Sequence, residues 1–185
     1  MIVSPSNIIN GLMNIVELNR VNIDRVFNHY KTGDRLHVFK GMRKSLPLSA
    51  FPSLELEPSS GSQEWLTTSV KVGEYTIQFT LTVTCDNDEF GAEYICEAAR
   101  AIVQVFTIPE NLCWEIPNEK FGIEDDTRLH IQFGSISGIT YNSTKDGTIR
   151  IAQWDWTGKV YEPYLFSAPV GPKTMDTKID ELPGQ

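Results

Sequence analysis

The stretch EYTIQFTLTVTC, residues 74–85, alternates apolar and polar side chains without a break. This period of two is that of a β-strand with one apolar face and one polar face. The odd positions are Tyr75, Ile77, Phe79, Leu81, Val83 and Cys85, and the even positions are Thr76, Gln78, Thr80, Thr82 and Thr84. We predict that the odd face covers a core, with Phe79 and Leu81 at its centre. The threonine-rich face then meets water, a ligand or another protein chain.

The segments around this strand predict an α+β fold. Apolar residues spaced three or four apart indicate helices over 5–18 and 85–106, and residues 22–30 form either a second helix or a turn. Further strands are predicted over 36–40, 51–58, 128–141 and 148–156. We therefore expect a single mixed, mostly antiparallel β-sheet with two main helices packed on one face. The domain spans 1–166, and 167–185 form an extended C-terminal arm.

Several turns and irregularities are also predicted. Prolines on both sides of 51–58 favour an edge strand, and SSGS at 59–62 reads as a turn. Residues 64–85 form either one long strand with a bulge at Gly73 or a hairpin. The other predicted irregularities are a long acidic loop at 113–127, with or without a short strand, a bulge near Ala152 and a turn at Thr157-Gly158.

Composition narrows the class of protein. The chain has 185 residues, 41% of them hydrophobic, and no stretch approaches the roughly 20 apolar residues of a membrane span. The N-terminus lacks the pattern of a signal peptide, so we expect a protein made in a reducing cytosol. We interpret its three cysteines as small buried side chains. The net charge of −8 argues against a general nucleic-acid binder.

The charge is unevenly distributed along the chain. Residues 20–45 carry seven Lys and Arg against two Asp, a net charge of +5. Residues 86–126 carry eleven Asp and Glu against one Arg and one Lys, a net charge of −9. These segments form either opposed patches that stack copies head to tail, or ordinary solvated surface.

The sequence offers no set of residues typical of catalysis. Phosphate-loop, dinucleotide-binding, zinc-protease and serine-hydrolase motifs are absent, and the three histidines lack partners at metal-ligand spacing. Asp86, Asp88, Gly91 and Glu97 match a calcium loop, but Phe90 at its fifth position cannot coordinate a cation. We expect no enzyme activity, no cofactor and no metal site.

Two groups of residues are candidates for contacts between subunits. The first comprises four residues of the polar strand face: Thr76, Gln78, Thr80 and Thr82. The second comprises Trp65, Trp154 and Trp156, which form either an aromatic patch for a partner chain or part of the core.

The order of these features resembles the tail terminator, or tail-completion, proteins of tailed bacteriophages. In that family a helical N-terminus precedes a strand with a PAI-V-P-like pattern, whose place FPSLELEP at 51–58 takes here. Glu64-Trp65 and the strand 70–85 match the glutamate-rich turn and long strand that follow. DEFGAEY at 88–94 matches the opening of the helix, and IRIAQW at 149–154 matches the closing strands. The resemblance covers about residues 5–162.

This resemblance implies a structural role in a virion, with assembly in the host cytoplasm. Family members form a six-fold ring that caps the tail tube and joins it to the neck, and DNA passes through the lumen without specific binding. The implied partners are further copies of the chain, the tail tube protein and a neck or connector protein, with a sheath protein as a further candidate and no membrane. The alternatives are another phage neck or head–tail connector or stopper protein, or a small ligand-binding domain or enzyme.

Overall fold

The computed structural model describes residues 5–41, 46–66, 70–85, 88–120, 123–144 and 147–163. The helices are α1 (Pro5–Leu18), α2 (Arg20–Tyr30) and α3 (Asp88–Val105), with short 3-10 turns η1 (Leu48–Ala50) and η2 (Pro109–Asn111). The strands are β1 (His37–Lys40), β2 (Ser53–Trp65), β3 (Val70–Thr84), β4 (Cys113–Lys120), β5 (Ile123–Ile136), β6 (Thr140–Ser143) and β7 (Ile149–Pro163). The predicted arm at 167–185 lies outside the described residues.

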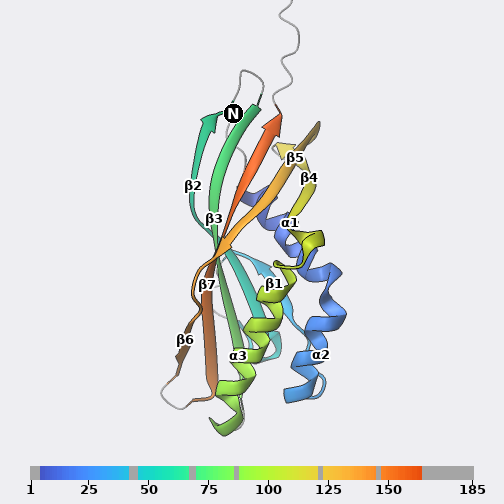
Figure 1. Ribbon diagram of the computed structural model, residues 1–185. Helices are drawn as coiled ribbons and strands as arrows, with labels where there is room; N and C mark the ends of the chain where they lie inside the picture. Colours follow the sequence, from blue (N-terminus) through green and yellow to red (C-terminus); the bar gives the residue numbers. More distant parts are fainter. Residues whose placement is uncertain are drawn as a thin grey trace, which may run out of the picture.

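The strands form one mixed sheet in the order β1-β2-β3-β7-β5-β4, and β6 pairs with β7. Only the β1–β2 pair among the described strands is parallel, so the sheet is mostly antiparallel as predicted. All three α-helices lie on the same side of the sheet (Figure 1). The α+β class is therefore confirmed, and the segment at 22–30 is a helix rather than a turn.

The core lies between the sheet and the helices. On β3 the odd residues from Tyr75 to Val83 are buried, as the alternation predicts. α3 packs on β3 and β7, whereas α1 contacts both β2 and β4. Because β2 and β4 lie on opposite sides of the central strands, the sheet must curl around α1 to reach it on both sides. A single hydrophobic cluster joins all these elements.

Phe79 lies at the centre of this cluster and is 0% exposed. Its ring stacks on Trp154 of β7 with centroids 5.4 Å apart, and it meets Phe106, just after α3, edge to face at 5.4 Å. These contacts connect the two longest strands to the helical layer.

Three glycines of the long strands β2, β3 and β7 lie directly against aromatic rings. A Cβ atom on Gly73 would lie 2.5 Å from the ring of Tyr75, and one on Gly61 would lie 2.7 Å from the same ring. On β7, a Cβ atom on Gly158 would lie 2.1 Å from the ring of Trp156. The absence of side chains at these glycines lets the two aromatic rings lie directly over the neighbouring backbone.

Two predictions about β2 are wrong. The strand lies between β1 and β3 rather than at an edge, and it continues through 59–62 instead of turning there. The register with β3 shifts between Pro58 and Ser60, which lets a residue without an N–H group lie inside a paired strand. β2 ends at Trp65 and pairs antiparallel with β3. Of the two structures predicted for residues 64–85, the hairpin is therefore the one observed.

Two predictions about the C-terminal half are also wrong. The stretch 113–127 is not a long loop with at most a short strand, because it contains β4 and the first residues of β5, which pair with each other. β7 has no bulge near Ala152 on its β3 side, where the register runs unbroken, and Thr157-Gly158 lies inside the strand. Ala152 and Gly158 lie on the same buried face as Trp154 and Trp156. Because these two residues are small, the hydrophobic pattern of the sequence did not reveal that face.

We expect Phe79→Ala to lower the free energy of unfolding by about 3–5 kcal/mol, because the substitution leaves a cavity between Trp154 and Phe106. Val21→Ala is the control, since Val21 is 76% exposed and its truncation should change stability by less than about 0.5 kcal/mol. Urea unfolding measures both changes. Equal effects of the two substitutions would contradict the central position of Phe79.

We expect Gly158→Ala to destabilise the protein by about 1–3 kcal/mol, because the added methyl group collides with Trp156 and with the backbone oxygen of Gln132. Gly138→Ala is the matched control, because no atom lies within 4 Å of its added methyl group. Thermal unfolding compares the two variants. A Gly158→Ala protein as stable as the control would show that the ring of Trp156 moves aside freely.

Candidate functional site

The helices leave a polar strip of the sheet uncovered on its other side. We call it the open face and define it by Thr76, Gln78 and Thr80 of β3 with their cross-strand neighbours Thr157, Asp155 and Gln153 of β7. All six side chains are partly exposed. Three of the four strand residues predicted as contacts therefore lie together on an accessible surface.

The predicted contact residue Thr82 differs from these three. It is only 9% exposed, and Ser53, its neighbour on β2, is 0% exposed. The polar face is thus covered at this end, and a contact role for Thr82 in a surface patch is not supported. Thr84 lines a separate cleft described below.

Hydrogen bonds across the strands organise the open face. The hydroxyl groups of Thr76 and Thr157 lie 3.4 Å apart, and Gln153 Nε2 donates to Thr80 Oγ1 at 3.3 Å. In the row between them, Asp155 Oδ1 is buried and has no hydrogen-bond partner among the described residues. The face therefore combines hydroxyl and amide groups with a carboxylate whose acceptor capacity is not filled.

The polar surface continues toward the ends of β3 and β7 that lie near Val70 and Pro163. There His130 Nδ1 lies 3.1 Å from Glu115 Oε1, and the Tyr161 hydroxyl donates to Gln132 at 3.2 Å. Two shallow hollows flank Lys159 and Tyr161, with volumes of about 280 and 420 Å³. Both hollows are lined by polar and apolar side chains together.

The tryptophans do not form a surface patch. Trp154 is 2% exposed and Trp156 is 0% exposed, so both fill the core, and the prediction of an aromatic contact patch is wrong for them. Their spacing of two residues correctly predicted that they share one face of the strand. That face is the one that the helices cover. Trp65 ends β2, and its side chain lies outside the described part of the chain.

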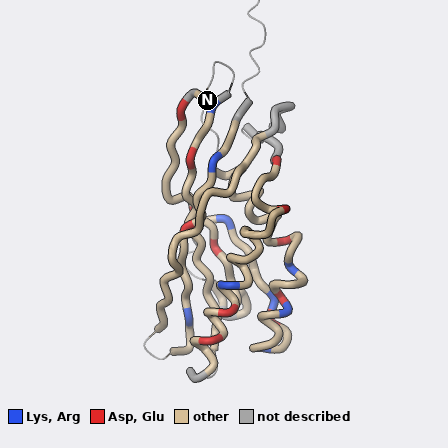
Figure 2. The backbone as a smooth tube through the Cα atoms, viewed as in Figure 1, with Lys and Arg blue, Asp and Glu red and all other residues tan. Residues whose placement is uncertain are grey.

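The helices of the basic and the acidic segment lie side by side, which does not favour the alternative of opposed charge patches. The segment that starts the basic stretch, α2, packs directly against α3 in the acidic stretch (Figure 2). Arg20 lies 2.6 Å from Glu17 and 3.5 Å from Asp24, so part of the basic charge is paired locally. The described charges of these two helices therefore provide no support for head-to-tail stacking.

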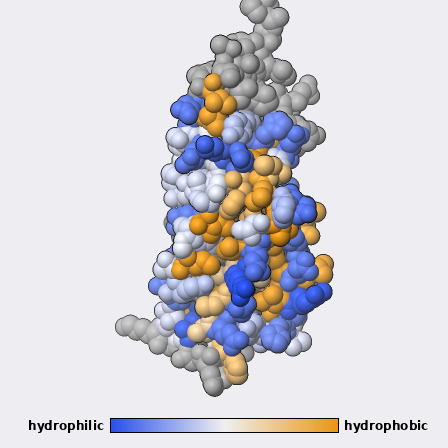
Figure 3. Space-filling view, viewed as in Figure 1, coloured by the Kyte–Doolittle hydropathy of each residue, from blue (hydrophilic) through white to orange (hydrophobic). Residues whose placement is uncertain are grey.

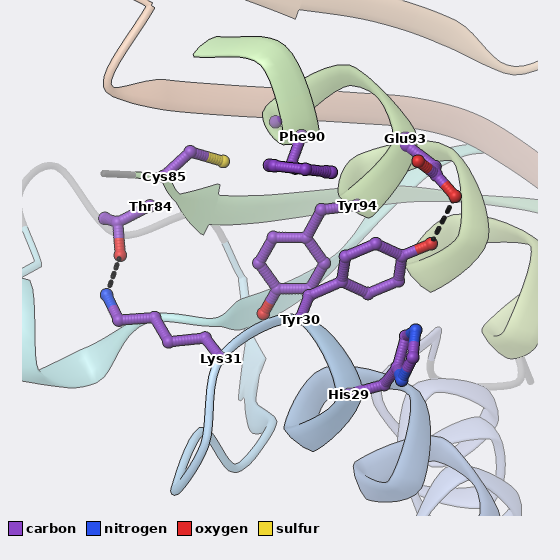
Figure 4. A pocket seen from close by; sticks show the side chains of 9 residues that line it. His29, Tyr30, Lys31, Thr84, Cys85, Phe90, Glu93 and Tyr94 are labelled. Carbon is purple, nitrogen blue, oxygen red and sulfur yellow. Dashed lines mark hydrogen bonds between the residues drawn. The ribbon is translucent and has the colours of Figure 1, made fainter. Parts of the chain in front are cut away.

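A cleft of about 330 Å³ opens where the end of α2 meets the start of α3. Figure 4 shows the aromatic side chains of Tyr30, Tyr94 and Phe90 around it, with Cys85 beside Phe90. Tyr30 donates its hydroxyl hydrogen to Glu93 at 3.1 Å. Lys31 Nζ donates to Thr84 Oγ1 at 3.4 Å, which closes the polar end of the cleft.

The tyrosines of this cleft hold the two helices together. Their rings stack with centroids 5.1 Å apart, and the Tyr94 hydroxyl donates to Asp34 Oδ2 at 3.1 Å. Burial raises the pKa of Tyr94 well above its ordinary value, and the negative charge of Asp34 raises this pKa further. Burial and the hydrogen bond to Glu93 also raise the pKa of Tyr30.

The described residues offer no metal centre and no membrane-spanning helix. No group of three or more His, Cys, Asp or Glu among them is arranged to hold a metal ion. Helix α3 begins at Asp88, so the residues that resembled a calcium loop are mostly helical. No helix in the described part is long and apolar enough to cross a membrane.

The cysteines correct one further prediction. Cys85 is half-buried, whereas Cys96 and Cys113 are exposed, so two of the three are not core side chains. None of the three takes part in a disulfide.

Comparison with known proteins assigns no family to this chain. No family model matches it, and no curated protein does. Among solved structures, a chain of the virion of a native gene transfer agent (GTA) particle is similar, with a TM-score of 0.48 and 10% sequence identity. The similarity covers 81% of this chain and 91% of that chain. A likeness of this degree assigns neither a family nor a function.

The raised pKa of Tyr94 predicts a loss of stability at alkaline pH. An unfolded tyrosine ionises near pH 10, so above this pH the unfolded chain releases a proton that the folded chain retains. Rising pH therefore favours unfolding, and the contribution of Tyr94 is complete below about pH 10 and lost above it. Between pH 9 and 11 we expect the wild type to lose about 1 kcal/mol more unfolding free energy than Tyr94→Phe. Parallel pH profiles for the two proteins, measured by urea unfolding, would contradict this prediction.

Proposed function

We propose that this protein is a structural virion protein of the tail terminator type, without enzyme activity. Its copies form a six-fold ring that caps a phage tail tube, joins it to the neck and lets DNA pass through the lumen. The observation that carries the proposal is the open face, a polar strip on the two longest strands of the sheet that no described helix covers. The sequence resemblance to tail terminator proteins supports the same role.

The chemistry of the open face suits a contact between folded subunits. Its hydroxyl and amide groups donate and accept hydrogen bonds, and polar groups of this kind do not promote aggregation of a free monomer as a large apolar patch does. Interfaces between proteins commonly have about one hydrogen bond per 100–200 Å², so such a strip can contribute to a specific contact.

The same face also suits the wall of a DNA channel. Glu57 lies opposite Gln78 on β2, and Asp155 lies opposite it on β7, so one row carries two carboxylates. Negative walls repel phosphate groups and prevent DNA from sticking. In the proposed ring, the open face therefore lies either between subunits or on the wall of the lumen. An added charge should affect ring assembly in the first case and the passage of DNA in the second.

A pair of substitutions at Gln78 tests the proposal. If the open face lies between subunits, both Gln78→Arg and Gln78→Glu should weaken ring formation at least tenfold, because each places an unpaired charge in a contact. If the face lines the lumen, both variants should assemble, and Gln78→Arg alone should retain DNA. Gln104→Arg is the matched control, since Gln104 is exposed on α3, away from the open face.

Light scattering and electron microscopy of the purified protein, alone and with isolated tail tubes, measure these outcomes. Rings at the ends of the tubes are the expected result for the wild type. A wild-type protein that stays monomeric in the presence of tail tubes would overturn the terminator proposal. Rings found at the head portal instead of the tube end would identify a connector or stopper protein.

A further inference from the structure

The cleft between α2 and α3 is a concave, largely aromatic hollow on the helix side of the sheet, away from the open face. In the view of Figure 3, hydrophobic residues reach the surface in several places among hydrophilic ones. The cleft differs from exposed hydrophobic residues such as Leu18 and Val21 because it is concave, with a volume of about 330 Å³. A hollow of this size with mostly apolar walls and a few polar groups is typical of sites for small molecules.

Hydrogen bonds hold two aromatic walls of the cleft in place. The rings of Tyr30 and Tyr94 stack with centroids 5.1 Å apart. The Tyr30 hydroxyl donates to Glu93, and the Tyr94 hydroxyl donates to Asp34, both at 3.1 Å. Because both rings are fixed at each end, a ligand does not need to order them, which lowers the entropic cost of binding.

The cleft is polar at its two ends and apolar between them. In Figure 4 the Lys31–Thr84 pair and the Tyr30–Glu93 pair lie at opposite ends, with the rings of Phe90 and Tyr94 between them. An ammonium group therefore marks one end and a carboxylate the other. The two oxygens of a carboxylate offer several acceptor sites, so the bond from Tyr30 does not exhaust those of Glu93.

The other charged or ionisable groups near the cleft do not reverse this polarity. His29 lies on the side of Tyr30 away from Phe90, with its ring edge to face against Tyr30 at 5.0 Å (Figure 4). Two further groups, Arg150 and Asp34, lie behind the walls and do not line the cleft. Their charges are opposite and offset each other, since Arg150 Nε lies behind Gly91 and Asp34 binds the hydroxyl of Tyr94.

We propose that this cleft binds a small dipolar molecule whose flat apolar centre separates a carboxylate from an ammonium group. The apolar centre packs against Phe90 and Tyr94. The carboxylate of the ligand lies near Lys31, and its ammonium group lies near Glu93, where the aromatic rings also attract a cation. This activity goes beyond the proposed structural role and uses a different surface.

Three matched probes test the charge pattern of the ligand. The compound para-aminomethylbenzoate carries both charges, whereas benzylamine and benzoate each carry one of them on the same ring. By NMR titration of the full chain we expect para-aminomethylbenzoate to bind with a dissociation constant of about 1 mM or below. Benzylamine and benzoate should bind at least fivefold more weakly. A single-charged probe that binds as tightly as para-aminomethylbenzoate, or no saturable binding of the latter, would overturn the inference.

Substitutions at the two charged ends assign each end of the ligand. Glu93→Gln should weaken the binding of para-aminomethylbenzoate at least fivefold and leave benzoate unchanged, because benzoate has no ammonium group. Lys31→Met should weaken para-aminomethylbenzoate likewise and leave benzylamine unchanged. The matched control is Glu97→Gln, one turn further along α3, which removes an exposed carboxylate that does not line the cleft. Equal weakening of all three probes by Glu93→Gln or by Lys31→Met would show a general structural effect and refute the assignment.

The rim and the wall of the cleft test where the probes bind. Phe90→Ala should weaken all three probes at least threefold without a change in the unfolding midpoint, because Phe90 is 57% exposed. Cys85 lines the cleft, so in a full chain with Cys96→Ser and Cys113→Ser it is the remaining thiol. Bound para-aminomethylbenzoate should slow the alkylation of Cys85 by iodoacetamide at least fivefold. An unchanged alkylation rate, or unchanged affinity in Phe90→Ala, would place the probes elsewhere and overturn the inference.

The two proposals fail independently. If the probes do not bind but rings form on tail tubes, the ligand site is refuted and the tail terminator function stands. If the probes bind in the cleft but no rings form, the ligand site stands and the terminator function is refuted.

Discussion

The packing of Phe79 between Trp154 and Phe106 is the interaction on which the rest of the structure depends. It joins β3 to β7 within the sheet and both strands to the helical layer. Because β3 alternates strictly, fixing Phe79 toward the helices fixes every other odd residue of that strand in the same direction. A shift of one residue in register would turn this apolar set toward the open face, so the ring contacts also determine the register.

The same constraint produces the surface that we propose to be functional. Once the odd residues of β3 and the even residues of β7 enter the core, the remaining side chains must lie on the other side of the sheet. At the open face these side chains are threonines, glutamines and an aspartate, which lie in pairs across the two strands. The buried rings behind this polar strip set its shape.

Much of the fold could be predicted from local patterns. The alternation at 74–85 and the helical spacing at 5–18 and 88–105 depend on residues close in sequence, so they were visible without the tertiary structure. The same alternation predicted the polar residues that β3 contributes to the open face. The even face of β7 was missed because Ala152 and Gly158 contribute little hydrophobic signal although both are buried. β4 and the first residues of β5 were interpreted mainly as an acidic loop, because charged residues are uncommon in strands, whereas the rest of β5 lies in the predicted strand at 128–141.

The sequence by itself determined which face of the central strand is apolar, the class of the fold and the polar character of the open face, because a period of two assigns neighbouring side chains to opposite sides. Only the tertiary structure decided that Trp154 and Trp156 are core residues, that Thr82 is covered and that α2 lies beside α3. It also created the cleft, whose walls Tyr30 and Tyr94 are 64 positions apart in the chain. Burial and proximity of this kind depend on how elements pack in three dimensions, and no local repeat in a sequence encodes them.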